Sequence, residues 1–500
     1  MNKVFSYKRQ HQEKELESII RNDARPQLVY VRGRRRVGKS WILKKVSEES
    51  KENNKYSTYF SGTKDSSAEE IKIQFINKIS QSFDTNQLKE INLTYLDWTR
   101  IFAEIIKILK TRKRKHTLIF DEIQWIAKTG SGFVGALKEA WIDIEKHNLA
   151  HIIVCGSSNK FFHDHVGGEE KLLRGLQTRS AIVVEPIPLY DVKKYVFPKW
   201  TQQEVALLYM LIGGVPYYLQ QIDASLGFIN SINQAIFTST TIFLDEVDEI
   251  LGLEFNKLGL VNIKKILSVL ADYGGSQAKV RKLFKISPST ISPLFEKLQN
   301  YKLIEIFNDF RYKDKLLIQG KENRFFINDF YLNTFFSVLE GLSTDIKKNA
   351  NNRNNIFAHR VLKNNKYYIE GFSGKAFEQL LRYCIRAYNV DSPLYKALLL
   401  KDYNFELYSI EDKATQIDLV VAGKTDRIAR IVECKWADKF DMKWLSQVSD
   451  KKIELPEGYT RVNVIFHSCL LDKRSKVRKA AQEKEVVLLE LGQLFLTDYS

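Results

Sequence analysis

The chain has 500 residues, of which 44% are hydrophobic and 27% are charged. This length is too great for one hydrophobic core and predicts about three or four domains, whereas the composition is ordinary for a folded protein. No run of about eighteen uncharged apolar residues is long enough to span a bilayer, and residues 1–8 lack the apolar core of a signal peptide, so we expect a cytoplasmic protein without membrane contact.

The formal net charge is +17, which favours a polyanionic partner. Basic residues gather at 32–36, 112–115 and 473–479. Charge alone does not separate a nucleic-acid partner from a lysine-rich surface that serves solubility. The four cysteines lie far apart without C-x-x-C spacing, so neither a disulfide framework nor a zinc knuckle is predicted.

The first predicted element is a strand at 28–31, followed by an octapeptide of the form G-x-x-x-x-G-K-[ST] and a helical pattern from Trp41. In such a loop the backbone N–H groups point at phosphate oxygens, the lysine reaches the β and γ phosphates, and the hydroxyl holds Mg²⁺. The sequence therefore predicts a site for ATP and Mg²⁺. Its nucleotide-binding residues are Gly33, Arg34, Arg35, Arg36, Val37, Gly38, Lys39 and Ser40.

A second strand, 117–120, ends in Asp121 and Glu122. Because parallel strands open into the ligand crevice at their carboxyl ends, Asp121 is predicted to reach the Mg²⁺ shell and Glu122 to polarise the attacking water. The strand at 151–155 runs into Ser157, which is either a sensor of the γ-phosphate or a turn residue.

Two further β-like runs, 56–60 and 181–184, complete a predicted five-stranded parallel sheet. Arg174 and Arg179 precede the last strand, where an arginine finger or phosphate sensor can sit. The sequence does not say which of the two, if either, meets a phosphate.

These motifs, together with 155–158 and the Gly-Gly-Val-Pro-Tyr-Tyr segment at 213–218, resemble the archaeal-type ATPases of the AAA+ and STAND-like P-loop group. The resemblance implies an α/β fold with an ATPase core at 1–195 and a small helical lid at 196–256. The arginine that the family carries after a Leu-x-Gly turn has no clear match, because Leu176 follows Gly175.

Residues 257–335 are interpreted as a winged-helix domain, with a recognition helix at 290–299 and a hairpin from 303–307 to 325–327. Such a helix reads DNA or packs against protein, and this one carries few groups able to read bases. Residues 336–370 are predicted to form a linker.

The last predicted domain, 371–500, holds Glu378 on a helix, Asp418 and Glu433 on two β-like segments, and Lys435. The two strand acids can bind divalent ions with Glu378 as an outer ligand, and Lys435 can orient water or stabilise phosphate. The pattern resembles the PD-(D/E)XK nuclease superfamily over about 371–470. This resemblance implies catalytic roles for Glu433 and Lys435, with Mg²⁺ or Mn²⁺ at Glu378, Asp418 and Glu433.

Three functions fit the predicted parts. In the first, ATP controls how a nuclease domain engages DNA; in the second, ATP drives a switch whose C-terminal domain holds DNA or protein without cutting. The third, a protein-remodelling ATPase, leaves the acid set unused. A homo-oligomer is also open, because Arg34–Arg36 can approach a neighbouring nucleotide or face solvent.

Overall fold

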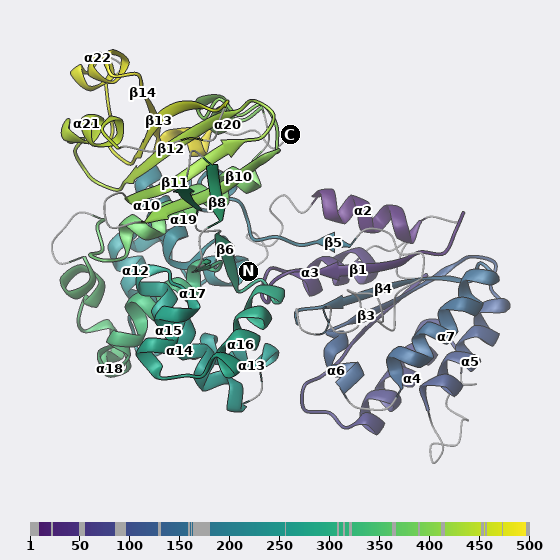
Figure 1. Cartoon of the computed structure of the whole chain (residues 1–500). Coiled ribbons are helices and arrows are strands. Elements are labelled where there is room, and N and C mark those ends of the chain that lie inside the picture. Colours follow the sequence, from purple (N-terminus) through teal and green to yellow (C-terminus); the bar gives the residue numbers. More distant parts are fainter. Residues whose placement is uncertain are drawn as a thin grey trace. The chain divides into compact units, whose positions relative to one another are not determined.

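The structure is a computed structural model of the whole chain (Figure 1). The residues that it describes are 10–21, 24–49, 56–85, 97–128, 132–158, 161, 163, 181–255, 257–307, 310–313, 316–319, 323–362, 367–388, 391–411, 416–451, 455, 458–472 and 474–496. The chain divides into two compact units. Unit 1 comprises Met1–Pro186 and Val215–Tyr217, and unit 2 comprises Ile187–Gly214 and Tyr218–Ser500.

Unit 1 is built on a five-stranded sheet with the order β2-β3-β4-β1-β5, in which all neighbouring strands are parallel. The strands are β1 (Leu28–Arg32), β2 (Ser57–Ser61), β3 (His116–Asp121), β4 (Ala150–Gly156) and β5 (Ile182–Val183). Their carboxyl ends share one edge of the sheet, as a parallel sheet requires. The predicted α/β fold and its five strands are confirmed.

Helices cover both faces of this sheet (Figure 1). They are α2 (Gln10–Ile20), α3 (Lys39–Lys44) with η1 (Lys45–Glu49), α4 (Ala68–Phe83), α5 (Trp98–Lys110), α6 (Ile123–Lys128) and α7 (Phe133–Lys146). Alternate residues of β1 enter different cores: Leu28 and Tyr30 pack with α4–α7, while Val29 and Val31 pack with α2 and α3. The strand is therefore apolar throughout, because both of its faces are buried.

Short helices follow from residue 189 onward and belong to unit 2, except that Pro216 and Tyr217 group with unit 1. They are α9 (Leu189–Asp191), η3 (Val192–Val196), α10 (Gln202–Ile212), α11 (Pro216–Leu219), η4 (Ala224–Leu226), α12 (Phe228–Ile236), η5 (Ile242–Leu244) and α13 (Glu246–Glu254). α10 starts at a capping box in which Thr201 and Glu204 satisfy each other's backbone N–H groups. Among all described residues, no helix combines the length and apolarity that a membrane span needs.

Three helices and a pair of antiparallel strands follow, in the order that the sequence predicts. They are α14 (Lys257–Tyr273), α15 (Gln277–Phe284), α16 (Pro288–Asn300), β6 (Ile304–Phe307) and β9 (Arg324–Ile327), with a separate hairpin of β7 (Phe310–Lys313) and β8 (Leu316–Gln319) between the last two. α16 begins two residues before the predicted helix, because Ser287 caps it and Pro288 fits its first turn.

The segment 336–370 was predicted to be a linker. Its described part is mostly helical: α17 (Phe330–Thr334) leads into η6 (Phe335–Leu339), α18 (Glu340–Lys348), η7 (Ala350–Asn352) and η8 (Phe357–Val361). Leu339, Ile346 and Phe357 are almost fully buried. Their burial makes this segment part of the core of unit 2.

The chain ends in a second five-stranded sheet, with the order β10-β11-β12-β13-β14. The first three strands are antiparallel and the last three parallel. Its elements are α19 (Ser373–Ala387), α20 (Pro393–Ala397), β10 (Phe405–Glu411), β11 (Gln416–Gly423), β12 (Ile428–Lys435), α21 (Lys443–Ser449), β13 (Thr460–His467), α22 (Lys476–Glu483), β14 (Val486–Glu490) and η9 (Leu491–Phe495).

Candidate functional site

The predicted phosphate-binding loop lies between β1 and α3, at the carboxyl edge of the first sheet. A Cβ atom on Gly33 would lie 2.2 Å from the carbonyl oxygen of Val184, so no larger residue fits there. Gly38 has a φ of 96°, which glycine adopts without strain. The loop is therefore shaped by close backbone approach at its start and by a left-handed turn before α3.

Lys39 is buried inside this loop, with 4% of its surface exposed. Its Nζ donates to the carbonyl oxygens of Gly33 and Arg34 at 2.8 and 2.9 Å. Burial lowers the pKa of the ammonium group, whereas nearby Asp121 and Glu122 raise it. The contacts hold the ammonium group of Lys39 within the curl of the loop, beside the two acids.

Asp121 ends β3 and is fully buried. One carboxylate oxygen accepts from the hydroxyl of Tyr59 at 2.5 Å, and the other accepts from the backbone N–H of Glu122 at 2.9 Å. Burial, followed by Asp121, raises the pKa of the Tyr59 hydroxyl, which stays protonated and donates. Sequence reasoning missed Tyr59, because nothing in the β2 sequence indicates its partner on β3.

Glu122 and Ser157 lie side by side, on the ends of β3 and β4. The Ser157 hydroxyl donates to Glu122 Oε2 at 3.2 Å. The side-chain amide of Gln124 donates to the same carboxylate and to the Ser157 oxygen, at 3.3 Å for the latter. Glu122 has a φ of 49°, so its backbone also leaves the strand direction here. The structure thus brings the predicted base and the predicted sensor together and adds Gln124.

The donor set at this edge fits a nucleoside triphosphate with Mg²⁺. The buried ammonium group of Lys39, the loop N–H groups before α3 and the hydroxyl of Ser40 are groups of the kind that bind phosphate oxygens and their Mg²⁺. Asp121 supplies the oxygen donor that Mg²⁺ prefers. The predicted arginines, Arg174 and Arg179, lie outside the described residues.

The acids predicted in the C-terminal domain also lie together in unit 2. Asp418 of β11 accepts the backbone N–H of Cys434 at 2.9 Å, which places it beside Glu433 of β12. Burial, then Asp418, raises the pKa of Glu378 to about 8. Burial and Glu433 likewise raise the pKa of Asp418. The mutual effects place all three carboxyl groups in one neighbourhood.

Each of these acids has basic neighbours, and Glu433 is held by two lysines. Lys435 Nζ lies 3.1 Å from Glu433 Oε2, and Lys451 Nζ contacts the other oxygen. Although burial opposes its charge, Glu433 and then Asp418 raise the pKa of Lys435. Arg382 lies 3.8 Å from Glu378. Sequence reasoning missed Lys451, which follows α21 rather than the E-x-K strand.

This arrangement does not fit a divalent metal as it stands. Within the described part of the chain, no three His, Cys, Asp or Glu side chains converge closely enough to hold a metal ion. Both oxygens of Glu433 face ammonium groups instead. Lysine therefore supplies positive charge beside Glu433, where the sequence predicted a metal ion.

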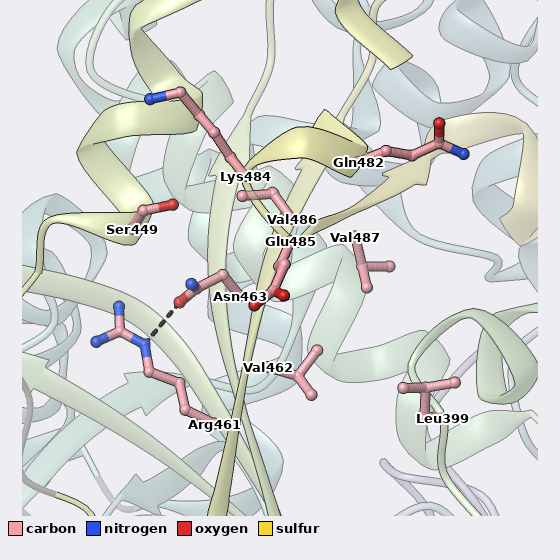
Figure 2. Close-up of a pocket in the computed structure, with 10 residues that line it drawn as sticks. All are labelled: Leu399, Ser449, Arg461, Val462, Asn463, Gln482, Lys484, Glu485, Val486 and Val487. Carbon is pink, nitrogen blue, oxygen red and sulfur yellow. Dashed lines mark hydrogen bonds between the residues drawn. The ribbon is translucent and has the colours of Figure 1, made fainter. Parts of the chain in front are cut away.

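A hollow of about 600 Å³ opens elsewhere on the same domain, along β13, α22 and β14 (Figure 2). Arg461 lines it and donates to Asn463 Oδ1 at 2.7 Å, as the dashed line shows. The same guanidinium donates to the carbonyl oxygens of Val448 and Lys451 at 2.7 and 2.6 Å. Arg461 thus fixes the end of α21 and the backbone of Lys451. The residues lining the hollow include none of the predicted site residues.

Comparisons with known proteins assign the N-terminal part of the chain. Residues 7–222 match a family model described as an ATPase domain predominantly from Archaea. Residues 345–453 match a second model, described as archaeal and bacterial proteins of unknown function. An uncharacterized protein of Methanocaldococcus jannaschii is 22% identical over 417 residues, which cover 83% of this chain and 84% of that protein.

Two solved structures are also similar over much of the chain. A Walker-type ATPase of Pyrococcus abyssi has 18% identity and a TM-score of 0.49, with 67% of this chain and 100% of that one covered. The ORC2 protein of Aeropyrum pernix has 10% identity and a TM-score of 0.41, with 69% and 98% covered. Residues 7–222, which contain the phosphate-binding loop, are thus similar to an ATPase domain found predominantly in Archaea.

Proposed function

We propose that the chain is an ATP-hydrolysing switch whose second unit binds DNA. In unit 1, Lys39 and the loop N–H groups would hold the phosphates, with Ser40 and Asp121 toward Mg²⁺. The ion, when bound, neutralises phosphate charge. Glu122 would accept a proton from the attacking water, oriented by Ser157 and Gln124. The hydrogen bonds among these three side chains are the observation that carries the hydrolysis step.

The DNA-binding proposal is carried by the surface of α15 and α16. α15 and the residue after it expose four basic side chains: Lys279, Arg281, Lys282 and Lys285. The start of α16 adds exposed hydroxyl groups on Ser289, Thr290 and Ser292. Basic side chains and hydroxyl groups are the usual donors to DNA phosphates. The predicted recognition helix carries Lys297 alone, so most of the basic charge lies on the helix before it.

A salt titration tests this surface directly. Fluorescence anisotropy would measure binding of the full chain to a labelled DNA duplex, with and without ATP. We expect affinity to fall steeply with salt, because neutralised phosphates release counterions. The double variant Arg281→Ala with Lys282→Ala should flatten the slope of log K against log salt by about 2, roughly one for each lost phosphate contact.

A matched control removes the same charge from another helix. Lys347 and Lys348 are exposed at the end of α18. Their replacement by alanine should leave the salt slope within about 0.5 of the wild-type value, because net charge alone adds no phosphate contact. Equal slopes for both double variants would reject α15 as the DNA surface. A flat salt response of the wild type would favour a protein partner.

The second candidate is metal-dependent DNA cleavage by the C-terminal domain. The clustering of Glu378, Asp418, Glu433 and Lys435 favours it, and the pairing of Glu433 with two lysines opposes it. Plasmid DNA incubated with the protein, ATP and Mg²⁺ or Mn²⁺ decides between cutting and binding. Cleavage that Asp418→Ala or Lys435→Ala abolishes without loss of ATPase activity would establish it. An uncut plasmid under both metals leaves the binding switch.

A further inference from the structure

One arginine of the phosphate loop is tied to a tyrosine far along the chain. Arg36 has a φ of 68°, a left-handed conformation that is uncommon for a residue with a side chain. Its guanidinium carbon lies 4.1 Å from the ring centroid of Tyr217. Both residues are half-buried, which strengthens a cation–π contact relative to one in open solvent. The loop is therefore held to Tyr217 at this point.

Tyr217 and the next residue belong to different units. Val215–Tyr217 group with unit 1, whereas Tyr218 groups with unit 2. The Tyr218 hydroxyl donates to Glu246 at 2.7 Å. The ring centroids of Tyr218 and Phe243 lie 5.2 Å apart. Both residues lie within α11, a single helical turn. A displacement of Tyr217 is thus passed through one peptide bond to a fully buried side chain of unit 2.

The chain just before this turn is fixed in unit 2. Ile187 donates its backbone N–H to the carbonyl oxygen of Gly214 at 2.7 Å. A Cβ atom on Gly214 would lie 1.8 Å from the carbonyl oxygen of Ile187, so the two backbones touch. Val215–Tyr217 are thus anchored on both sides, and Val215 and Pro216 are themselves buried. Because a packed segment of this kind transmits displacement, a shift of Tyr217 reaches the neighbouring residues of the chain.

We propose that Arg36 and Tyr217 form a nucleotide-sensitive latch, which reports occupancy of the phosphate loop to unit 2 through Tyr218. The inference rests on the proposed ATP binding. Phosphate oxygens form charge-assisted hydrogen bonds with a guanidinium group that exceed a cation–π contact in strength. ATP therefore competes with the Tyr217 ring for Arg36. Binding of ATP opens the latch and frees Tyr217 and the chain that follows it.

The competition makes an unusual prediction for Tyr217→Leu, which keeps apolar volume and removes the ring. Because the ring no longer competes for Arg36, this variant should bind a fluorescent ATP analogue about two- to fivefold more tightly than the wild type. A merely structural role of Tyr217 would instead weaken binding. Tyr217→Phe keeps the ring face and should bind like the wild type. Far-UV circular dichroism checks that each variant is folded.

Hydrogen exchange of the amides at 218–222 supplies the second measurement. Saturating ATP should speed this exchange about threefold or more in the wild type and in Tyr217→Phe. In Tyr217→Leu and Arg36→Gln the exchange should already be fast and should not respond to ATP. Tighter ATP binding by Tyr217→Leu with this loss of response would support the latch.

Two results would overturn it: weaker ATP binding by Tyr217→Leu, or an exchange response in that variant equal to the wild-type response. A wild type that binds ATP without any response at 218–222 would overturn it as well. Failure of the wild type to bind nucleotide would appear in the binding step alone, and it would remove the ATPase proposal together with the latch.

Discussion

Buried acids end a strand in each unit, but their hydrogen-bond partners differ in charge. In unit 1, Asp121 accepts from the hydroxyl of Tyr59 and from a backbone N–H group, and Glu122 accepts from Ser157 and Gln124. In unit 2, Glu433 accepts from the ammonium groups of Lys435 and Lys451. Neutral donors orient a carboxylate and leave its negative charge in place, whereas ammonium groups cancel it.

Lysines and acids therefore make different contacts in the two units. In unit 1, Lys39 donates hydrogen bonds to the carbonyl oxygens of Gly33 and Arg34, although two acids lie near it. Neutral carbonyl groups do not cancel the charge of an ammonium group. In the proposed function this charge would serve a phosphate and the acids of unit 1 would serve a cation, whereas in unit 2 lysines pair with Glu433.

The largest effect is expected from Lys39→Ala, which removes the buried positive charge of unit 1. ATP binding and turnover should fall at least about 100-fold, because the loop loses its one side-chain cation buried among the phosphate donors. Nucleotide titration and a phosphate-release assay measure this loss. Lys110→Ala removes an exposed lysine of α5 and serves as the matched control. Turnover by Lys39→Ala near the wild-type rate would show that unit 1 does not need the charge of Lys39.

Glu122→Gln tests the carboxylate of unit 1 that accepts from neutral donors. The variant should bind ATP like the wild type and lose turnover about 100-fold or more, since the amide cannot accept the proton from water. Ser157→Ala removes one orienting donor and should cost about tenfold. Single-turnover kinetics separate chemistry from binding. Normal hydrolysis by Glu122→Gln would show that another group acts as the base.

The sequence predicted those parts of the site whose positions depend on neighbouring residues in the chain. The loop at 33–40 and the pair Asp121–Glu122 each lie within a few residues of a strand end, so their position follows from the strand itself. Tyr59 and Gln124 act through side-chain contacts instead. Tyr59 meets Asp121 because β2 pairs in register with β3, and the sequence shows strand order less directly than strand position.

The same reason explains what the sequence did not reveal in unit 2. Glu433 and Lys435 share a strand and were found by their spacing, whereas Lys451 reaches Glu433 from the end of a helix. The segment 336–370 was predicted to be a linker, and its described part includes buried polar contacts. Asn349 is in fact buried and donates to the carbonyl oxygen of Phe237 at 2.8 Å. A buried polar contact of this kind has no local signature.

Lys451→Met tests the internal neutralisation in unit 2. Loss of one ammonium group leaves Glu433, which is 7% exposed, partly uncompensated. We expect the free energy of unfolding to fall by about 1–3 kcal/mol, less than for a fully buried pair because Lys451 is itself 20% exposed. Chemical denaturation measures the loss. Lys424→Met breaks an exposed pair with Glu406 and should cost less than about 1 kcal/mol.

Added Mn²⁺ sharpens this test. The ion should raise the melting temperature of Lys451→Met more than that of the wild type, because the uncompensated carboxylate attracts a cation that Lys451 otherwise replaces. Omission of nucleotide keeps unit 1 out of the measurement. If Mn²⁺ stabilises the wild type and Lys451→Met equally, Lys451 does not compete with a cation. That result would contradict the view that lysine neutralises the acids of unit 2.

A pH-dependent effect concerns two buried histidines, one in each sheet. Burial, and in addition Arg112, lowers the pKa of His116 to about 3, and burial lowers the pKa of His467 to about 4. Between these values and the ordinary 6.5, the unfolded chain binds a proton that the folded chain does not. Stability should therefore decrease as pH falls below about 6.5, by up to about 1.4 kcal/mol per pH unit for each histidine.

His116→Gln should remove part of this slope and keep a side chain that can bond Thr58, the partner of the imidazole at 2.8 Å. Urea unfolding at pH 7 and pH 5 measures the change. The His467 imidazole packs edge-on against the ring of Phe440, so His467→Gln tests a second buried histidine in a more apolar setting. If neither variant alters the difference between the two pH values, carboxyl groups rather than these histidines govern the acid sensitivity of both sheets.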